Sequence, residues 1–263
     1  MTATNVSGTV ASDFTLLDVV QGLQDLDGAG VTELATHLGL AKSSVHKHLK
    51  SLEQREFVVN NDGAYSLSLK FLEYGGFVRD GNRIYRYARR KAARLAEQTG
   101  EMILVSVREY DHGVILFRTN DRYGLQNLVP LGERILLHQN AAGRAMLAEF
   151  SDEEIDRFVQ QTDLPPAMEK TITDPDQLVA EVEQIRERGY AVSRGERFEG
   201  IRAVSAAIED EERGALGAIS VVVPDEIAIA DELEAEYAEA IAIAARDVSL
   251  ELKYEDHGDG VSS

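Results

Sequence analysis

The sequence predicts an α+β protein with an N-terminal winged helix-turn-helix, a linker helix and a C-terminal domain whose antiparallel sheet is covered by helices. Three observations support this fold class. Residues 14–68 read as helix, helix, glycine turn, helix and hairpin. Further along the chain, two longer hairpins have helices before, between and after them. The length of 263 residues is also large for one compact core, which predicts more than one domain.

The N-terminal region divides into a tail and a compact domain. Residues 1–12 are small and polar, and we predict a flexible tail there. Residues 13–78 form the predicted winged helix-turn-helix. Its first helix is DFTLLDVVQGLQDL, which DGAG ends, and VTELATHL is the second. Gly39 provides the turn before the third helix, AKSSVHKHLKSLEQ, and the strands FVV and AYSLS flank the tight-turn signal NNDG.

The rest of the chain contains a predicted linker helix and a second domain. Residues 79–99 hold the linker helix, because NRIYRYARRKAARLAEQ has no helix breaker. Residues 100–253 form the second domain, with the hairpin strands MILVSVRE and GVILFRTN, then IRAVSAAI and GALGAISVVV. Three stretches are predicted helices, namely NAAGRAMLAEF, DPDQLVAEVEQIRERG and residues 225–252. Residues 254–263 are predicted to be a flexible tail.

Composition restricts the chemistry and the setting of the protein. The chain has no cysteine, which excludes disulfides, thiolate zinc sites and cysteine nucleophiles. No apolar run is long enough for a membrane span and the N-terminus has no signal-peptide core, so we expect a cytoplasmic protein. The net charge of −19 argues against a broadly basic nucleic-acid binder. It suits a very salty, halophilic cytoplasm, with an ordinary acidic protein as the alternative.

One short helix departs from this acidic character. Residues 41–52 contain three lysines and no carboxylate. At about 100° per residue, Val45, Leu49 and Leu52 share one sector and the lysines face away from it. The alternative is an ordinary solvated helix face, but the preceding turn and the following hairpin favour contact with DNA. The predicted DNA-binding residues are Lys42, Ser43, Ser44, His46, Lys47 and Lys50, with Asn60 and Asn61 from the hairpin turn.

The predicted linker helix carries an arginine stripe opposite an apolar face. Its members are Arg83, Arg86, Arg90 and Arg94. The stripe either contacts DNA phosphates or pairs with carboxylates of this chain or of a second subunit, and we favour the pairing. We expect the apolar face of the helix at a dimer interface.

An enzyme is the main rival class. The sequence has no P-loop, no GxGxxG and no GxSxG motif. His46 and His48 diverge by about 200° on a helix and cannot hold one metal ion together. We therefore predict no catalytic residue, no metal site and no cofactor.

Three segments resemble the IclR family of transcription regulators. The first is VTELATHLGLAKSSVHKHLKSLEQREFVVNNDGAYSLSLKFLEYG. The second, LLHQNAAGRAMLA, is similar to the family pattern PLHxxAxGKAxLA, with Leu136 for Pro and Arg144 for Lys. The third is GYAVSRGERFEGIRAVSAAIEDEERGALGAISVVVP. The resemblance covers residues 13–252 and implies a GAF-like second domain, a homodimer or dimer of dimers, a double-stranded DNA operator and a small-molecule effector.

The resemblance also implies where the effector binds. Carried over by position, the effector-binding residues are Ala142, Gly143, Ser193, Ala203 and Ser220. Small residues at 141–143 would open a helix N-terminus to a carboxylate, although close helix packing explains them equally well. Ser193 replaces an acid and Ala203 replaces a cysteine of many members, so we expect a less polar pocket. Organic, sugar and aromatic acids remain open as effectors, and an architectural DNA-binding protein without an effector remains the alternative.

Overall fold

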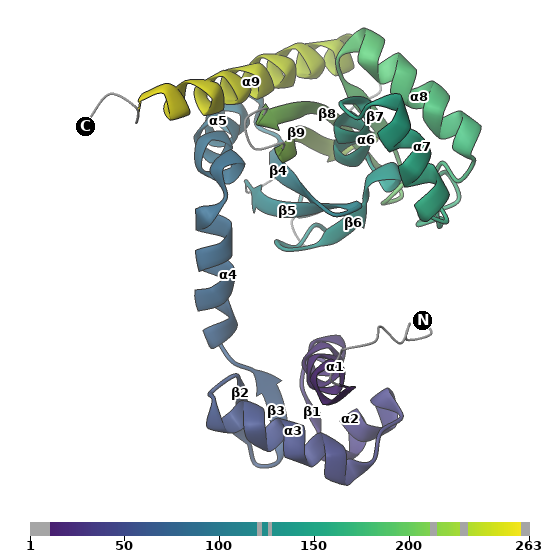
Figure 1. Ribbon diagram of the computed structural model, residues 1–263. Helices are drawn as coiled ribbons and strands as arrows, with labels where there is room; N and C mark the ends of the chain where they lie inside the picture. Colours follow the sequence, from purple (N-terminus) through teal and green to yellow (C-terminus); the bar gives the residue numbers. More distant parts are fainter. Residues whose placement is uncertain (1–10, 120–122, 126–127, 211–214, 227–230, 259–263) are drawn as a thin grey trace. The chain divides into compact units, whose positions relative to one another are not determined.

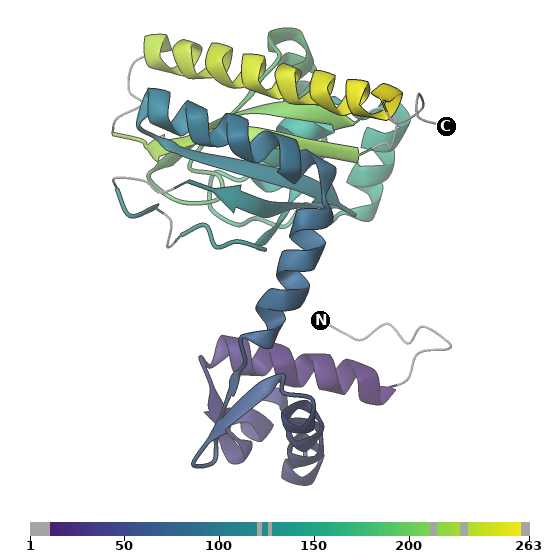
Figure 2. The ribbon, with the colours of Figure 1, turned by 90° about the vertical axis from the view of Figure 1, so that its left-hand side faces the viewer.

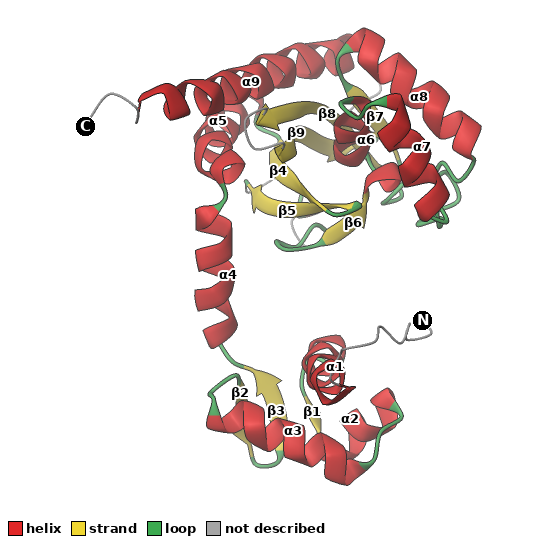
Figure 3. Ribbon diagram, viewed as in Figure 1, coloured by secondary structure: helices red, strands yellow, loops and turns green. Residues whose placement is uncertain are grey.

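The computed structural model describes residues 11–119, 123–125, 128–210, 215–226 and 231–258 (Figure 1). The chain divides into two compact units, Met1–Val78 and Arg79–Ser263. No helix in the described ranges is both long enough and apolar enough to cross a membrane. Figure 3 shows the helices and strands of each unit, and the predicted α+β class is confirmed.

The N-terminal unit is built from short helices and a small sheet. Its elements are α1 (Ala11–Asp25), β1 (Ala29–Gly30), α2 (Val31–Leu38), α3 (Lys42–Gln54), β2 (Val58–Asn61) and β3 (Ala64–Leu67). The strands form an antiparallel sheet in the order β1-β3-β2. Val19, Leu34 and Leu49 are fully buried where the three helices meet. This arrangement is the predicted winged helix-turn-helix, although α1 begins two residues inside the predicted tail.

The connection after the winged helix differs from the prediction. Residues 70–81 form a helix of their own, α4 (Lys70–Gly81), and α5 (Arg83–Thr99) follows it. The break lies at Asn82, whose Oδ1 accepts a hydrogen bond from the Tyr85 amide 3.0 Å away and so caps α5. Helix α4 was not predicted, because Gly75 and Gly76 lie inside it and glycine weakens a helix.

The C-terminal unit contains a six-stranded antiparallel sheet. Its strands are β4 (Met102–Glu109), β5 (His112–Arg118), β6 (Arg134–Leu136), β7 (Ala191–Arg194), β8 (Ile201–Asp210) and β9 (Ala215–Pro224). Their order is β6-β5-β4-β9-β8-β7. The helices are the 3-10 turn η2 (Leu137–Gln139), α6 (Ala141–Ala148), α7 (Asp152–Gln161), α8 (Pro175–Arg188) and α9 (Asp231–Gly258).

Helices cover both faces of this sheet. Alternate strand residues point to opposite faces, so Ile103 and Val105 pack against α5 and α9 while Leu104 faces the other side. Figure 2 shows α5 and α9 side by side on the first face. Helices α6, α7 and α8 form the second layer, with Leu147 and Leu178 fully buried in it.

The apolar face of α5 was assigned wrongly to a dimer interface. Ile84, Ala88 and Ala92 are almost completely buried in the core of this same unit. An amphipathic helix beside an open sheet face buries its apolar stripe there, and this helix follows directly on the sheet it covers. The predicted linker helix is therefore part of the C-terminal unit.

Two further boundaries are informative. Helix α9 continues to Gly258, so residues 254–258 are helical and not part of a flexible tail as predicted. Strand β7 pairs with β8 only between Arg202 and Ser205, which leaves the second half of β8 without a neighbour on that side among the described residues. There, the amide of Glu209 donates to the Ser249 hydroxyl of α9 at 3.0 Å.

Candidate functional site

Helix α3 presents two different faces in the N-terminal unit. Val45 and Leu49 are fully buried and Leu52 is nearly so. Their spacing places one stripe in the core and turns the opposite face outward. Gly39, at φ 66°, ends α2 in a left-handed conformation that glycine adopts without a Cβ penalty, and this turn sets α3 across α2.

The outward face of α3 carries most of the predicted DNA-binding residues. Lys42, Ser43, His46 and Lys47 are exposed, and Ser44 is half-buried. Within the described ranges, Lys42 and Lys47 have no ion-pair partner, so both ammonium groups are available to a phosphate or a base edge.

Lys50 differs from the other two lysines. Its Nζ lies 2.7 Å from Oε2 of Glu53, three residues along the helix. The hydrogen bond to Glu53 raises the pKa of Lys50, and the same contact lowers the pKa of Glu53. Lys50 therefore remains charged but shares its charge with a neighbouring carboxylate.

The two predicted asparagines, Asn60 and Asn61, have different roles in the hairpin that follows α3. Asn60 Oδ1 accepts a hydrogen bond from the Gly63 amide at 2.9 Å, so this side chain stabilises the turn. Asp62 and Gly63 both have positive φ, 52° and 92°, as a type I′ turn requires. Asn61 is exposed beside them. Asn61 is thus the better placed of the two asparagines for an external contact.

The arginine stripe of α5 separates into two parts. Arg83 is buried and donates to the Asp210 carboxylate at 3.0 Å and to the Leu252 carbonyl at 2.8 Å. Arg86, Arg90 and Arg94 are exposed, and none forms an ion pair with another described residue. Among these four arginines, the described residues show pairing with a carboxylate of this chain for Arg83. Pairing of the other three with a second subunit stays a prediction.

A cavity of about 50 Å3 lies between the sheet and the N-terminus of α6. We call it the serine cavity, because four strands each contribute a serine to it. Its walls include aliphatic and aromatic side chains such as Leu104, Ile115 and Phe198. The polar lining residues are Ser106, Asn140, Ser193, Arg197, Ser205 and Ser220.

The N-terminus of α6 faces the serine cavity through Ala141 and Ala142. Asn140 caps the helix, since its Oδ1 accepts from the Gly143 amide at 2.7 Å. Gly143 itself does not line the cavity. A Cβ at this position would lie 2.1 Å from the Leu137 carbonyl oxygen, so glycine is needed here for close packing against η2.

A buried charged network lies behind the serine cavity. The Arg144 guanidinium, with 1% of its side chain exposed, donates to Glu196 at 3.1 Å and to the Val192 carbonyl at 2.6 Å. The other Glu196 oxygen accepts from the Ser193 hydroxyl at 2.6 Å and also from the Arg194 amide. Glu196 therefore caps the turn after β7, and its charge is already neutralised by Arg144.

A second ion pair lies at the edge of the cavity. Arg197 donates to Glu133 Oε1 at 2.7 Å. Burial raises the pKa of Glu133, although the neighbouring Arg197 opposes that shift. Among the residues that the structure describes, the buried Nε of Arg197 and Oε2 of Glu133 have no hydrogen-bond partner. The carboxylates of Glu133 and Glu196 are thus each paired with an arginine.

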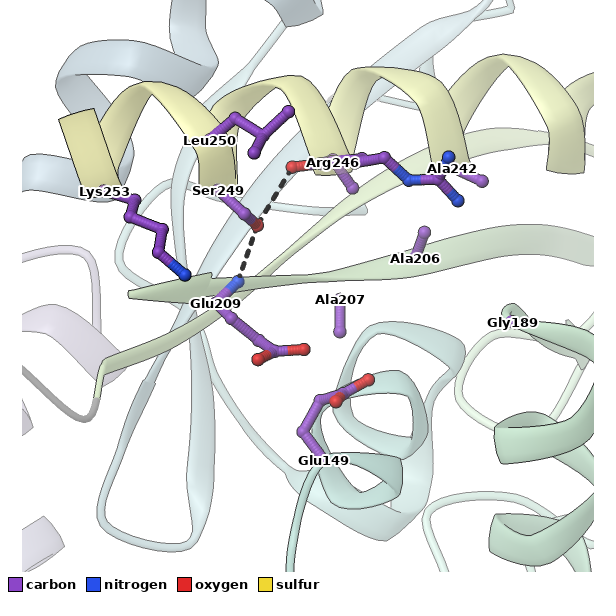
Figure 4. A pocket seen from close by; sticks show the side chains of 11 residues that line it. Glu149, Gly189, Ala206, Ala207, Glu209, Ala242, Arg246, Ser249, Leu250 and Lys253 are labelled. Atoms are coloured by element: carbon purple, nitrogen blue, oxygen red, sulfur yellow. Dashed lines mark hydrogen bonds between the residues drawn. The ribbon is translucent and has the colours of Figure 1, made fainter. Parts of the chain in front are cut away.

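A larger groove of about 300 Å3 lies elsewhere in this unit, beside the unpaired half of β8 (Figure 4). The carboxyl groups of Glu149 and Glu209 point into it, and Arg246 and Lys253 approach from α9 (Figure 4). Loss of water raises the pKa of Glu149 to about 7, and the neighbouring Glu209 adds to the shift. We call this the Glu149–Glu209 groove.

Comparison with known proteins identifies both units. Residues 16–62 match the IclR helix-turn-helix domain, and residues 78–250 match the bacterial transcriptional regulator IclR C-terminal domain. The chain belongs to the IclR family. The resemblance predicted from the three sequence segments is confirmed, and this IclR-family chain is a DNA-binding transcription regulator.

Individual relatives agree over nearly the whole length. The HTH-type transcriptional regulator KdgR of Escherichia coli is 26% identical over 250 residues, which is 94% of this chain and 95% of KdgR. The Thermotoga maritima IclR structure has a TM-score of 0.76 at 26% identity, over 91% of this chain and 99% of that one. An IclR homologue from Microbacterium hydrocarbonoxydans, complexed with 4-hydroxybenzoate, has a TM-score of 0.73 at 20% identity, with 91% and 99% covered, and so shares the fold.

The family pattern located most of the cavity but not all of it. Of the carried-over effector residues, Ala142, Ser193, Ala203 and Ser220 line the serine cavity, and Gly143 does not. Four polar residues that also line the cavity were not predicted, namely Ser106, Asn140, Arg197 and Ser205. A signal was available for the two serines, because each interrupts a run of apolar residues within its strand.

Proposed function

We propose that α3 reads the half-sites of an operator and that Lys42, Ser43, His46, Lys47 and Asn61 make the outermost contacts. The observation that carries this is the exposed cationic face of α3, on which Lys42 and Lys47 have no ion-pair partner among the described residues. The turn at Gly39 precedes this helix. An α-helix fits the major groove, where lysine, serine and histidine bond to base edges or phosphates. Lys50 contributes less, because Glu53 holds its ammonium group.

The second part of the proposal is that a small-molecule effector occupies the serine cavity and changes operator binding. Its lining supports this, being mostly apolar with a few convergent polar groups. The structural relative with bound 4-hydroxybenzoate supports an organic acid as the general class. The protein acts as a cytoplasmic regulator without a catalytic role.

We also propose that the functional species is a homodimer or a dimer of dimers. An apolar groove of about 300 Å3 on the N-terminal unit, lined by Leu16, Leu17 and Phe71 among others, supports this. Leu72 and Phe77 on α4 are 70% and 83% exposed. Apolar surface of this extent on a soluble protein is typical of an interaction site, and two heads would match a palindromic operator.

The net charge of −19 supports the proposal that the protein works in a very salty cytoplasm. At about 1 M salt the Debye length is about 3 Å, so distant carboxylates of the chain repel DNA weakly while close lysine contacts persist. We therefore propose that operator binding survives high salt.

The test is a binding titration of the full-length protein against its own upstream DNA, with and without a panel of organic acids. The Lys42→Ala, Lys47→Ala double variant should lose specific binding while its thermal unfolding stays unchanged. Ser249→Ala, far from α3 in the sequence, is the control. An unaltered affinity of the double variant would contradict the assignment of α3 as the reader.

The alternative is an architectural DNA-binding protein whose C-terminal unit takes no effector. Thermal unfolding distinguishes the two, because a ligand that binds only the folded state raises its stability. If one acid raises the melting temperature of the C-terminal unit, and this increase is absent in Ala203→Leu, whose larger side chain fills the cavity, the result supports a sensor that binds an effector there. No shift across the panel would favour the architectural protein.

A further inference from the structure

The Glu149–Glu209 groove opens beside the half of β8 that β7 does not reach. Pairing with β7 ends at Ser205, whereas β8 continues to Asp210. Helix α9 borders the groove on one face of the sheet (Figure 4). The C-terminal ends of α6 and α8, at Glu149 and Gly189, border it on the other face. The groove shares no lining residue with the serine cavity, so the two are separate sites.

The charged groups of this groove are not neutralised by one another. Within the described ranges, neither Glu149 nor Glu209 forms an ion pair, and the same holds for the Arg246 guanidinium. All three residues line the groove. Glu149 is exposed and Glu209 is half-buried, so a solute can reach both carboxyl groups. Two carboxyl groups and one guanidinium thus face the same space, and each is open to a partner of opposite charge.

The two carboxyl groups favour a cation between them. Loss of water and the hydrogen bond with Glu209 raise the pKa of Glu149 to about 7, so the pair retains a proton below that pH. The cations around the pair are Arg186 of α8, which opposes the shift, and Arg246 and Lys253 of α9. An ammonium group bonded to both carboxylates would replace the retained proton. The C-terminal ends of α6 and α8 also favour a positive charge there.

The rest of the lining consists of exposed backbone and small side chains. The Glu209 amide donates to Ser249 and so points away from β9. Strand residues two apart direct their N–H and C=O groups to the same side, so Ala207 presents both groups toward the groove. The volume of about 300 Å3 is twice the roughly 150 Å3 of a cavity that holds benzene. Small or apolar side chains leave this space open, namely Ala206, Ala207, Ala242, Ala245 and Leu250.

We propose that the Glu149–Glu209 groove binds a free α-amino acid with an apolar side chain, as a second ligand site of the C-terminal unit. The ammonium group of the amino acid bonds to the carboxylates of Glu149 and Glu209, and its carboxylate pairs with Arg246. The side chain lies against the alanines and Leu250. A ligand with a single charge would leave either the carboxyl pair or the guanidinium without a partner. This site is independent of the proposed effector in the serine cavity.

The experiment is calorimetric titration of the full-length protein with L-leucine and two analogues. Isoamylamine lacks the carboxylate, and 4-methylpentanoate lacks the ammonium group. At pH 8 we expect L-leucine to bind at least about tenfold more tightly than either analogue, since a hydrogen bond to a charged group is worth about that factor. At pH 6 its affinity should fall about tenfold, because the proton held by Glu149 must then leave.

Two variants distinguish the two ends of the ligand. In Glu149→Gln, L-leucine should bind no better than 4-methylpentanoate, and the difference between pH 8 and pH 6 should disappear. In Arg246→Gln, L-leucine should bind no better than isoamylamine. Glu153→Gln is the matched control, because Glu153 is exposed on α7 outside the groove and its loss should change neither comparison. Ala203→Leu, which fills the serine cavity, should leave L-leucine binding unchanged.

Three results would overturn the proposal. The first is the absence of L-leucine binding at pH 8. The second is binding that Glu149→Gln preserves and Ala203→Leu abolishes, which would place the amino acid in the serine cavity. The third is equal binding of L-leucine and isoamylamine by the wild type, which would show that Arg246 holds no carboxylate and that the groove accepts a simple amine.

Discussion

The guanidinium of Arg144 and the carboxylate of Glu196 form an ion pair of 3.1 Å in which only 1% of the Arg144 side chain is exposed. The two residues join α6 to the turn after β7, and Glu196 also accepts from Ser193 of the serine cavity. Pairing of β7 with β8 sets the backbone of Ser193, and its hydroxyl is oriented by Glu196, which Arg144 holds behind the cavity.

Removing Glu196 should destabilise the C-terminal unit strongly. Glu196→Ala leaves the buried Arg144 charge without its partner, and such a loss costs about 3 kcal/mol or more. Chemical denaturation of the full chain measures the effect. Asp152→Ala is the control, because Asp152 is 91% exposed in its pair with Arg186 and should cost less than about 1 kcal/mol. Equal effects of the two substitutions would show that the buried pair is not important for stability.

Glu53 should weaken DNA binding in the wild-type protein. Glu53→Gln releases the ammonium group of Lys50 and removes a negative charge from the helix that faces DNA. We expect tighter binding and a steeper dependence of log K on log salt. Lys47→Ala should change both quantities in the opposite direction, with the salt slope reduced by about one if Lys47 contacts a phosphate. Titrations at several salt concentrations measure both, and an identical slope for Glu53→Gln and the wild type would contradict the role assigned to Lys50.

The Glu149–Glu209 groove should make stability depend on pH. The pKa of Glu149 is about 7 in the folded protein, against an ordinary value of 4.5, so the folded state keeps a proton that the unfolded state releases between these pH values. Its contribution to the free energy of unfolding is thus fully present below about pH 4.5 and is lost as the pH rises to about 7.

The measurement is the melting temperature of the wild type and of Glu149→Gln from pH 5 to pH 8. The variant should gain stability relative to the wild type as the pH rises. Glu154→Gln is a suitable comparison, since hydrogen bonds from Ser151 lower the pKa of Glu154 below its ordinary value of 4.5. Its contribution to stability changes only as the pH falls below about 4.5, so the difference between Glu154→Gln and the wild type should stay constant from pH 5 to pH 8. A constant difference between Glu149→Gln and the wild type at every pH would refute this account.

Gly143 should tolerate no side chain. In Gly143→Ala the new methyl group would meet backbone atoms of Leu137, which cannot move without displacing η2. We expect a loss of about 3 kcal/mol in unfolding free energy, at the upper end of overpacking effects. Gly76→Ala on α4 is the matched control, because a Cβ there meets no atom within 4 Å and should stabilise the helix by about 0.5–1 kcal/mol. Similar melting temperatures of the two variants would contradict this packing role.

Sequence patterns predicted the elements whose signals are local. The hairpin turn at Asp62 and Gly63, the buried stripe of α3 and both long hairpins follow from turn chemistry and periodicity. The presence of Gly75 and Gly76 argued against a helix at residues 70–81. No local rule shows that the helix-forming residues on either side of two glycines are sufficient to form α4. Periodicity also found the apolar face of α5 but could not identify its partner, the sheet of the same unit.

The site was less predictable for a related reason. Family positions located Ser193 and Ser220, but Ser106 comes from a strand far from both in sequence. The place of Ser106 in the lining of the serine cavity depends on the register between β4 and β9, which puts Ser106 on the same face of the sheet as Ser220. Likewise, the three-residue spacing of Lys50 and Glu53 on a helix allows the two side chains to pair but does not require it. Whether they pair depends on their side-chain rotamers.

The short length of β7 has a consequence for how the protein behaves when it is concentrated. An uncovered strand edge invites a strand of another molecule to extend the sheet, which is a common route to aggregation. On the unpaired half of β8, the amide of Glu209 already donates a hydrogen bond to the Ser249 hydroxyl. The Glu209 side chain also places a carboxyl group beside that edge. An incoming strand would have to displace the hydroxyl of α9 and bury the carboxyl group. Ser249 of α9 and the Glu209 carboxyl group thus oppose extension of the sheet at this edge.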